Sequence, residues 1–110
     1  MTVKDQRQIR LLEAAALVRD LHLNRVAEAQ RALSLNRARD AALDPAPVDC
    51  ADPAVQSAAL QHRVWAEGRR RALAPIIAAQ EQAVVERRGV AARAFARYAV
   101  IEQMFIKSGR

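Results

Sequence analysis

The amino-acid sequence predicts an all-α protein in which two long helices pair as an antiparallel coiled-coil hairpin, with the second helix the longer one. Ala, Leu, Arg, Glu and Gln dominate, whereas the 110 residues include only three glycines, four prolines and four aromatic side chains. This composition is typical of long helices rather than sheets. A proline-rich break divides the chain, and a heptad pattern follows the break. Together, these three observations predict the fold class.

The first helix is predicted over residues 2–43, because this stretch contains neither glycine nor proline. Thr2 and Asp5 have the spacing of a capping box, which begins a helix. At 100° per residue, apolar side chains gather on one broad face that requires a partner. They are Leu11, Leu12, Ala15, Ala16, Val18, Leu23, Val26, Ala29 and Leu33. Three further leucines lie nearly opposite, either scattered on the surface or forming a second contact surface: Leu17, Leu21 and Leu35.

Residues 44–53 are predicted to form a loop, because three prolines and three aspartates lie within this segment. Asp44 precedes a proline, which disfavours the helical conformation. Asp52 followed by Pro53 has the pattern of an N-cap and the first residue of a new helix. Cys50 is the only cysteine, so no internal disulfide can form. Without a basic neighbour in the sequence, its thiol is expected to be inert.

The second helix is predicted over residues 54–107, where a seam advances in alternating steps of four and three residues, as in a heptad repeat. The seam residues are Leu73, Ile77, Gln80, Val84, Arg87, Ala91, Ala94, Tyr98, Ile101 and Phe105. Gln80 and Arg87 interrupt its apolar character, and such polar seam residues more often fix the register than form a site. Gly68 and Pro75 weaken the helix, so we expect a kink or a short break between them. Two amphipathic helices joined by one loop bury their stripes by folding back antiparallel.

The unequal lengths of the two helices point to a binding surface at the C-terminal end. At about 1.5 Å per residue the helices measure roughly 58 and 81 Å. If pairing starts at the loop, Asp5 lies near Ala92, and residues 93–110 project beyond the first helix. Exposed clusters of aromatic, Met and Arg side chains are typical of interfaces. The predicted partner-binding residues are therefore Arg93, Phe95, Arg97, Tyr98, Ile101, Met104 and Phe105. Alternatively, a break near Pro75 shortens the helix, or the overhang folds back or pairs in a dimer.

No pattern for catalysis, for a cofactor or for a metal is found in the sequence. His22 and His62 are the only histidines, and no His, Cys or acidic residues have the spacing of a tetrahedral metal site. The three glycines stand apart, so a glycine-rich phosphate loop is missing. We therefore predict a protein that is not an enzyme, holds no cofactor or metal and takes no small-molecule substrate.

The formal net charge of +6 raises nucleic acid as a partner. However, the arginines, including the run Arg69 to Arg71, spread around the predicted helix instead of forming one stripe, and aromatic residues do not alternate with them. An acidic protein surface suits this charge better. The N-terminus lacks the apolar core of a secretory signal, and no stretch approaches 18 uncharged apolar residues. We therefore expect a cytoplasmic protein without a membrane span.

Three features of the chain resemble the FliJ and YscO group of flagellar and type III secretion export proteins. They are residues 9–14 opening the first helix, Trp65 with the arginine cluster after it, and the Arg- and Ala-rich run from Glu86 to Phe105. The likeness is architectural and covers most of the chain. Members of that group are antiparallel coiled coils similar to the two-helix stalk of the rotary ATPase γ subunit, with one end in the central pore of the export ATPase ring.

The resemblance implies a set of partners. Residues 93–107 would contact the export ATPase, and other surfaces would meet the export gate and substrate chaperones. It also implies a cytoplasmic location with association to the membrane through the export machinery. Two other classes remain open: a secretion chaperone or generic coiled-coil adaptor that binds an export substrate along its seam, and a basic helical nucleic-acid-binding protein whose affinity falls steeply with salt.

Overall fold

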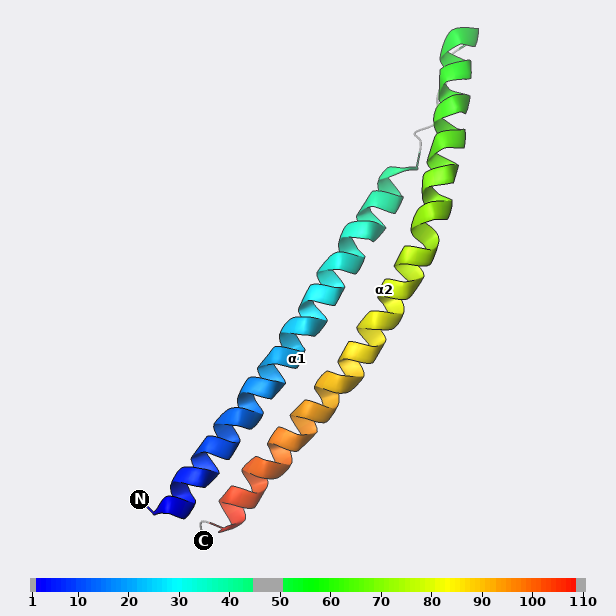
Figure 1. Ribbon diagram of the computed structural model, residues 1–110. Helices are drawn as coiled ribbons and strands as arrows, with labels where there is room; N and C mark the ends of the chain where they lie inside the picture. The colour runs from blue at the N-terminus through cyan, green and yellow to red at the C-terminus, as the bar shows by residue number, and fades with distance from the viewer. Residues whose placement is uncertain (1, 45–50, 109–110) are drawn as a thin grey trace. The chain divides into compact units, whose positions relative to one another are not determined.

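The computed structural model describes residues 2–44 and 51–108, and within these ranges it contains two helices and no strand (Figure 1). Helix α1 spans Val3–Ala42, with 40 residues, and helix α2 spans Pro53–Ser108, with 56 residues. The prediction of an all-α helical hairpin with a longer second helix is confirmed. Most of the predicted loop, including Cys50, lies outside the described residues.

Both helices begin at the predicted caps. Thr2 Oγ1 accepts a hydrogen bond from the Asp5 N–H at 3.2 Å, and Asp5 Oδ2 accepts one from the Thr2 backbone N–H at 3.2 Å and another from the Thr2 hydroxyl at 2.8 Å. These reciprocal bonds form a capping box. The hydrogen bond from the Thr2 hydroxyl, followed by that from its backbone N–H, holds the pKa of Asp5 below its ordinary value. The contribution of this cap is therefore present at neutral pH and is lost as the pH falls through the lowered pKa.

Helix α2 also begins at a capping side chain. Asp52 Oδ1 accepts a hydrogen bond from the Ala54 N–H at 2.9 Å, and Pro53 occupies the first helical position, where its missing N–H costs nothing. From there α2 continues without interruption through Gly68 and Pro75. The predicted break between those residues is therefore wrong. A proline removes only one backbone hydrogen bond, and the helical turns on either side of it remain intact.

Replacing Gly89 by Ala is expected to stabilise the protein by about 0.5–1 kcal/mol. Gly89 lies inside α2, and a Cβ added there would meet no heavy atom within 4 Å. The methyl group therefore fits, while the unfolded chain loses conformational freedom. The melting temperature followed by circular dichroism should rise for Gly89→Ala and, for the same reason, for Gly68→Ala. A fall at either position would contradict the open surroundings of that glycine.

The chain forms two compact units, and each holds a stretch of both helices. We call Met1–Gln30 together with Ala83–Arg110 the terminal unit, and Arg31–Gln82 the central unit. In the terminal unit the guanidinium of Arg19 lies 4.3 Å from the centroid of the Tyr98 ring. Further along α1, the backbone carbonyl of Arg25 accepts a hydrogen bond from Arg87 Nη1 at 3.2 Å. An advance along α1 thus corresponds to a step back along α2, so the two stretches are antiparallel, as Figure 1 shows.

This pairing corrects the predicted overhang of residues 93–110. A hairpin paired from the loop would place Asp5 near Ala92, whereas Arg19 already contacts Tyr98. The C-terminal part of α2 therefore lies beside α1 and does not project past it. The physical reason is that this pairing removes apolar side chains at the seam positions Tyr98, Ile101 and Phe105 from water.

In the central unit the excess length of α2 lies at the N-terminal end of that helix. Asn36 Nδ2 donates a hydrogen bond to Gln80 Oε1 at 2.9 Å, and Asp44, just after α1, forms an ion pair with Arg70. The first turns of α2 therefore lie beyond the last turn of α1, and α2 extends past the end of α1 in Figure 1. At the other end of residues 53–68, Trp65 lines a hollow with Ala42 and Leu43 of the α1 end, and Ala66 is buried. We call residues 53–68 the α2 extension.

The seam of α1 is more polar than predicted. Buried and half-buried residues recur in alternating steps of four and three: Gln8, Leu12, Ala15, Arg19, His22, Val26, Ala29, Leu33, Asn36, Asp40 and Leu43. Leu11, Val18 and Leu23, which were expected on the buried face, are 52%, 46% and 40% exposed. The buried stripe is narrower than predicted because a two-helix seam covers little more than two positions in each heptad. In α2 the predicted seam is buried or half-buried except at Arg87, whose side chain reaches the α1 backbone.

Candidate protein-interaction surfaces

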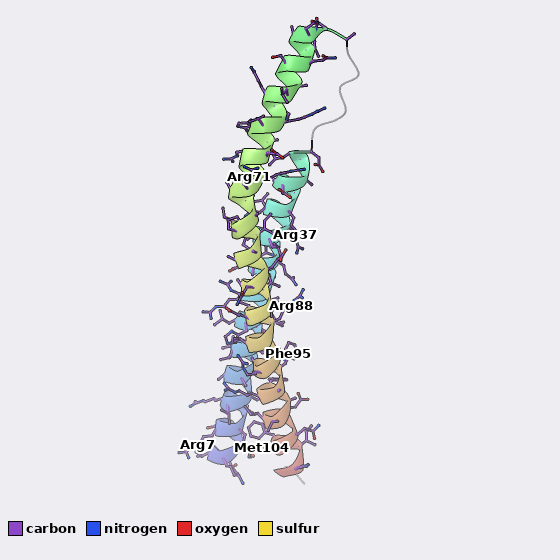
Figure 2. All side chains as sticks on the ribbon, turned by 90° about the vertical axis from the view of Figure 1, so that its right-hand side faces the viewer. Arg7, Arg37, Arg71, Arg88, Phe95 and Met104 are labelled. Carbon is purple, nitrogen blue, oxygen red and sulfur yellow. The ribbon has the colours of Figure 1, made fainter. Side chains whose placement is uncertain are left out.

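The predicted partner-binding residues fall into two groups in the terminal unit. Those at seam positions are half-buried and belong to the hairpin itself: Tyr98, Ile101 and Phe105. The others are exposed: Arg93, Phe95, Arg97 and Met104. Figure 2 labels Phe95 and Met104 of this group. Phe95 is 45% exposed and Met104 is 60% exposed. Only the second group is therefore accessible to a partner of the folded hairpin.

Arg19 of α1 fixes the aromatic residues of this region. Its guanidinium lies 4.3 Å from the centroid of the Tyr98 ring and 5.7 Å from that of Phe95, within cation–π distance of both. Arg19 Nε donates a hydrogen bond of 3.1 Å to Asp20 Oδ1, and this bond contributes most to raising the pKa of the guanidinium. The sequence prediction missed Arg19. The available signal was its position, four residues after Ala15, which continues the heptad seam.

An outward face of α2 in the terminal unit combines cations with apolar side chains. Arg93, Arg97, Val100 and Met104 follow one another in steps of four, three and four residues, so they share one side of the helix. Val100 is 58% exposed, and both arginines are exposed. We call these four residues the Arg93–Met104 face. Arginine and methionine are both enriched at protein interfaces, and their combination here provides charge beside apolar area.

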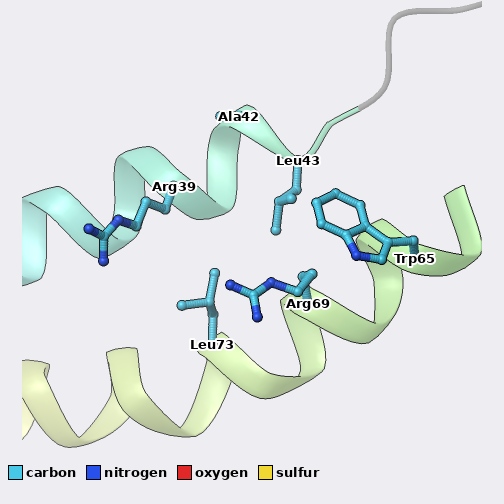
Figure 3. Close-up of a pocket in the computed structure, with 6 residues that line it drawn as sticks. All are labelled: Arg39, Ala42, Leu43, Trp65, Arg69 and Leu73. Atoms are coloured by element: carbon cyan, nitrogen blue, oxygen red, sulfur yellow. The ribbon is translucent and has the colours of Figure 1, made fainter. Parts of the chain in front are cut away.

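A second candidate surface lies in the central unit, beside the only tryptophan of the chain. A hollow of about 400 Å³ is lined by Arg39, Ala42, Leu43, Trp65, Arg69 and Leu73 (Figure 3). The Trp65 side chain is 55% exposed, and the His62 ring lies 5.6 Å away between centroids. We call this site the Trp65 hollow. Trp65 is not among the predicted partner-binding residues, because pairing from the loop would have placed it beside α1.

The three arginines that follow Trp65, Arg69 to Arg71, each have different surroundings. Arg70 pairs with Asp44, and this hydrogen bond is the first cause that raises the pKa of Arg70. Arg69 lines the Trp65 hollow, and Arg71 is exposed. The expectation that these arginines form no single basic stripe agrees with this arrangement.

The two histidines, His22 and His62, belong to different units. His22 occupies a seam position and lines a hollow of about 190 Å³ with Arg25, Arg87 and Val90, whereas His62 packs near Trp65. Among residues 2–44 and 51–108, no group of three or more His, Cys, Asp or Glu side chains could hold a metal ion. In the same ranges, no helix is long and apolar enough to cross a membrane.

The amide pair between Asn36 and Gln80 is expected to hold the helices in register. Replacing Asn36 by Leu should lower the free energy of unfolding by about 1–2 kcal/mol, because the half-buried Gln80 amide loses its partner. Replacing both residues by Leu should recover that loss but allow other registers and oligomers. Urea unfolding and analytical ultracentrifugation of the three proteins would check this. Equal stability of the single variant and the unmodified protein would contradict the role of the pair.

Comparisons of the chain with protein-family models, with curated proteins and with solved structures return no match. A function therefore has to be inferred from the hairpin and its exposed surfaces.

Proposed function

We propose that the chain is a non-catalytic helical hairpin whose task is to bind other proteins. The observation that carries this proposal is the contrast between what the hairpin buries and what it exposes. The buried apolar residues of the described chain are mostly small: Leu33, Ala66, Val84, Ala91 and Ala94. Large apolar side chains such as Trp65, Phe95 and Met104 are at least 45% exposed. Single exposed apolar residues are common, but apolar side chains grouped with arginines favour a binding surface.

The more specific role that we propose follows from the resemblance to the FliJ and YscO group. The chain would be a component of a flagellar or type III protein export apparatus and would bind the export ATPase ring, with the export gate and substrate chaperones as further partners. It would work in the cytoplasm and reach the membrane only through the export machinery. Two features support this role: the helical hairpin with unequal helices, and the basic, apolar Arg93–Met104 face in the terminal unit.

Isothermal titration of the purified full chain with the purified export ATPase of the same organism tests the specific role. The unmodified chain should bind, and the triple variant Arg93→Ala, Arg97→Ala, Met104→Ala should bind at least tenfold more weakly. A matched control replaces two exposed arginines and one exposed apolar residue of α1 in the same unit: Arg7→Ala, Arg10→Ala and Leu17→Ala. This control should retain full affinity, and circular dichroism should show unchanged helicity for both variants.

Other outcomes would assign other functions. No binding to the ATPase, together with tight binding to a single filament or hook protein, would make the chain a secretion chaperone or an adaptor. Binding to unrelated nucleic acids with an affinity that falls steeply with salt would instead indicate a nucleic-acid-binding protein. Either outcome would overturn the export role.

A further inference from the structure

The α2 extension exposes a face that the hairpin does not use. Leu60, Val64 and Gly68 are each four residues apart, so they lie along one side of the helix, with Trp65 at its border. Leu60 is 60% exposed, Val64 is 64% exposed and Trp65 is 55% exposed. A Cβ added at Gly68 would meet no heavy atom within 4 Å, which shows that the space above this face is open. The apolar face therefore continues toward the Trp65 hollow.

Positive charge borders this apolar face. From Arg63 to Arg71 the chain carries four arginines but only one acidic residue, Glu67. Arg70 is paired with Asp44, whereas Arg69 lines the Trp65 hollow together with Arg39 of α1. The surface thus has an apolar centre and a basic edge.

Three kinds of binding partner can be compared with this apolar centre and basic edge. A second copy of the chain would bring the same arginines against this edge, and like charges repel. A nucleic acid would match the charge, but its bases stack on aromatic rings, and it would leave the aliphatic Leu60 and Val64 without an apolar partner. An amphipathic helix with acidic residues beside its apolar stripe satisfies both the apolar centre and the basic edge.

We propose that the α2 extension and the Trp65 hollow form a docking site for an acidic amphipathic helix of another protein. The apolar stripe of that helix lies along Leu60 and Val64, and one apolar side chain enters the hollow beside Trp65. Carboxylates of the partner pair with Arg39 and Arg69. At about 1.5 Å per residue the extension is about 24 Å long and accommodates about four turns of a partner helix. The inference rests on the proposed protein-binding function and adds a second surface with a defined partner chemistry.

A synthetic helical peptide of about 20 residues provides the probe, with leucines at helical spacing and glutamates on both flanks. One comparison peptide has the same composition in scrambled order, and another has lysines in place of the glutamates. Fluorescence anisotropy of the labelled peptides should show that the full chain binds the acidic amphipathic peptide at least tenfold more tightly than either comparison peptide. Because Trp65 is the only tryptophan, its emission should shift to shorter wavelength on binding. Equal binding of the three peptides would overturn the proposal.

The double variant Leu60→Glu, Val64→Glu should weaken binding of the acidic peptide at least tenfold. Both positions are exposed, and glutamate favours a helix at least as well as valine, so the fold should be retained. The matched control is Leu17→Glu, Leu21→Glu, a pair of exposed residues with the same spacing on α1 in the terminal unit. Unchanged affinity of the extension variant, or an equal loss in the control, would overturn the docking site.

Separate readouts distinguish this site from the proposed function. If the export ATPase binds while the acidic peptide does not, the docking site is wrong and the proposed function stands. If the peptide binds while the ATPase does not, the docking site stands and the export role fails. Dimerisation, or binding of a single-stranded oligonucleotide, that is lost in Leu60→Glu, Val64→Glu would assign the face to a different occupant and overturn the inference.

Discussion

Removing residues 93–110 is expected to unfold the N-terminal half of α1 together with the part of α2 that is removed. In the terminal unit Arg19 contacts Tyr98, so the deleted segment is the partner of the N-terminal half of α1. A helix that loses the packing of its apolar face does not persist in water on propensity alone. The helical signal in circular dichroism should therefore fall by about a third, well beyond the share of the deleted residues. The melting temperature should fall as well.

The exposed residues of the same segment provide the control. Replacing Arg93, Arg97 and Met104 by Ala should leave the helical signal and the melting temperature nearly unchanged, because these side chains are exposed. If the truncated chain instead lost only the signal of the deleted residues, residues 93–110 would be a free overhang after all. The pairing of Arg19 with Tyr98 would then be incorrect.

Leu33→Ala is expected to lower the free energy of unfolding by about 2–4 kcal/mol. Leu33 is 6% exposed and is the one residue of α1 that is buried. The other buried residues of the described chain are Val84 and three alanines, so few contacts can compensate for the lost volume. For a small two-helix protein, a loss of this size removes a large part of the total stability.

Leu35→Ala is the matched control for this substitution. Leu35 lies two residues further along the same helix, is 54% exposed and undergoes the same change in helix propensity. Its replacement should cost less than about 1 kcal/mol. Urea unfolding of both variants measures the difference. Equal losses for the two variants would contradict the placement of Leu33 in the seam.

The sequence predicted the helices well because their limits depend on local chemistry. The capping box of Thr2 and Asp5 and the N-cap of Asp52 before Pro53 both form as expected. The heptad seam from Leu73 to Phe105 is recognisable for the same reason, since its spacing lies within one stretch of helix.

The register between the helices could not be obtained in this way, because it depends on residues far apart in the sequence. Asn36, Arg19 and His22 occupy seam positions of α1, yet a polar residue there is difficult to distinguish from a surface residue by pattern alone. The predicted seam of α2 begins at Leu73, and the structure continues it back to the half-buried Arg70 and the buried Ala66. The first turns of α2 precede this seam.

The candidate site changed with the register. Three of the residues that were predicted to bind a partner occupy half-buried seam positions of the hairpin instead: Tyr98, Ile101 and Phe105. The excess length of α2 proved to lie in the α2 extension, where Trp65 lines a hollow with the last residues of α1. The longer helix does extend past the shorter one, as its length predicted. The position of the paired seam, and not that of the loop, decides at which end of α2 the extra residues lie.

Cysteine cross-linking tests this register most directly. In a Cys50→Ser background, the pair Arg37→Cys, Glu81→Cys should be joined within one chain by a short bis-maleimide, because the two exposed side chains lie within hydrogen-bonding distance, at 3.0 Å. The pair Arg37→Cys, Leu60→Cys corresponds to a hairpin that pairs from the loop, and it should remain unlinked. Both pairs leave Asn36 and Gln80 in place. The register of the structure predicts efficient cross-linking of 37 to 81 only, whereas efficient cross-linking of 37 to 60 would contradict it.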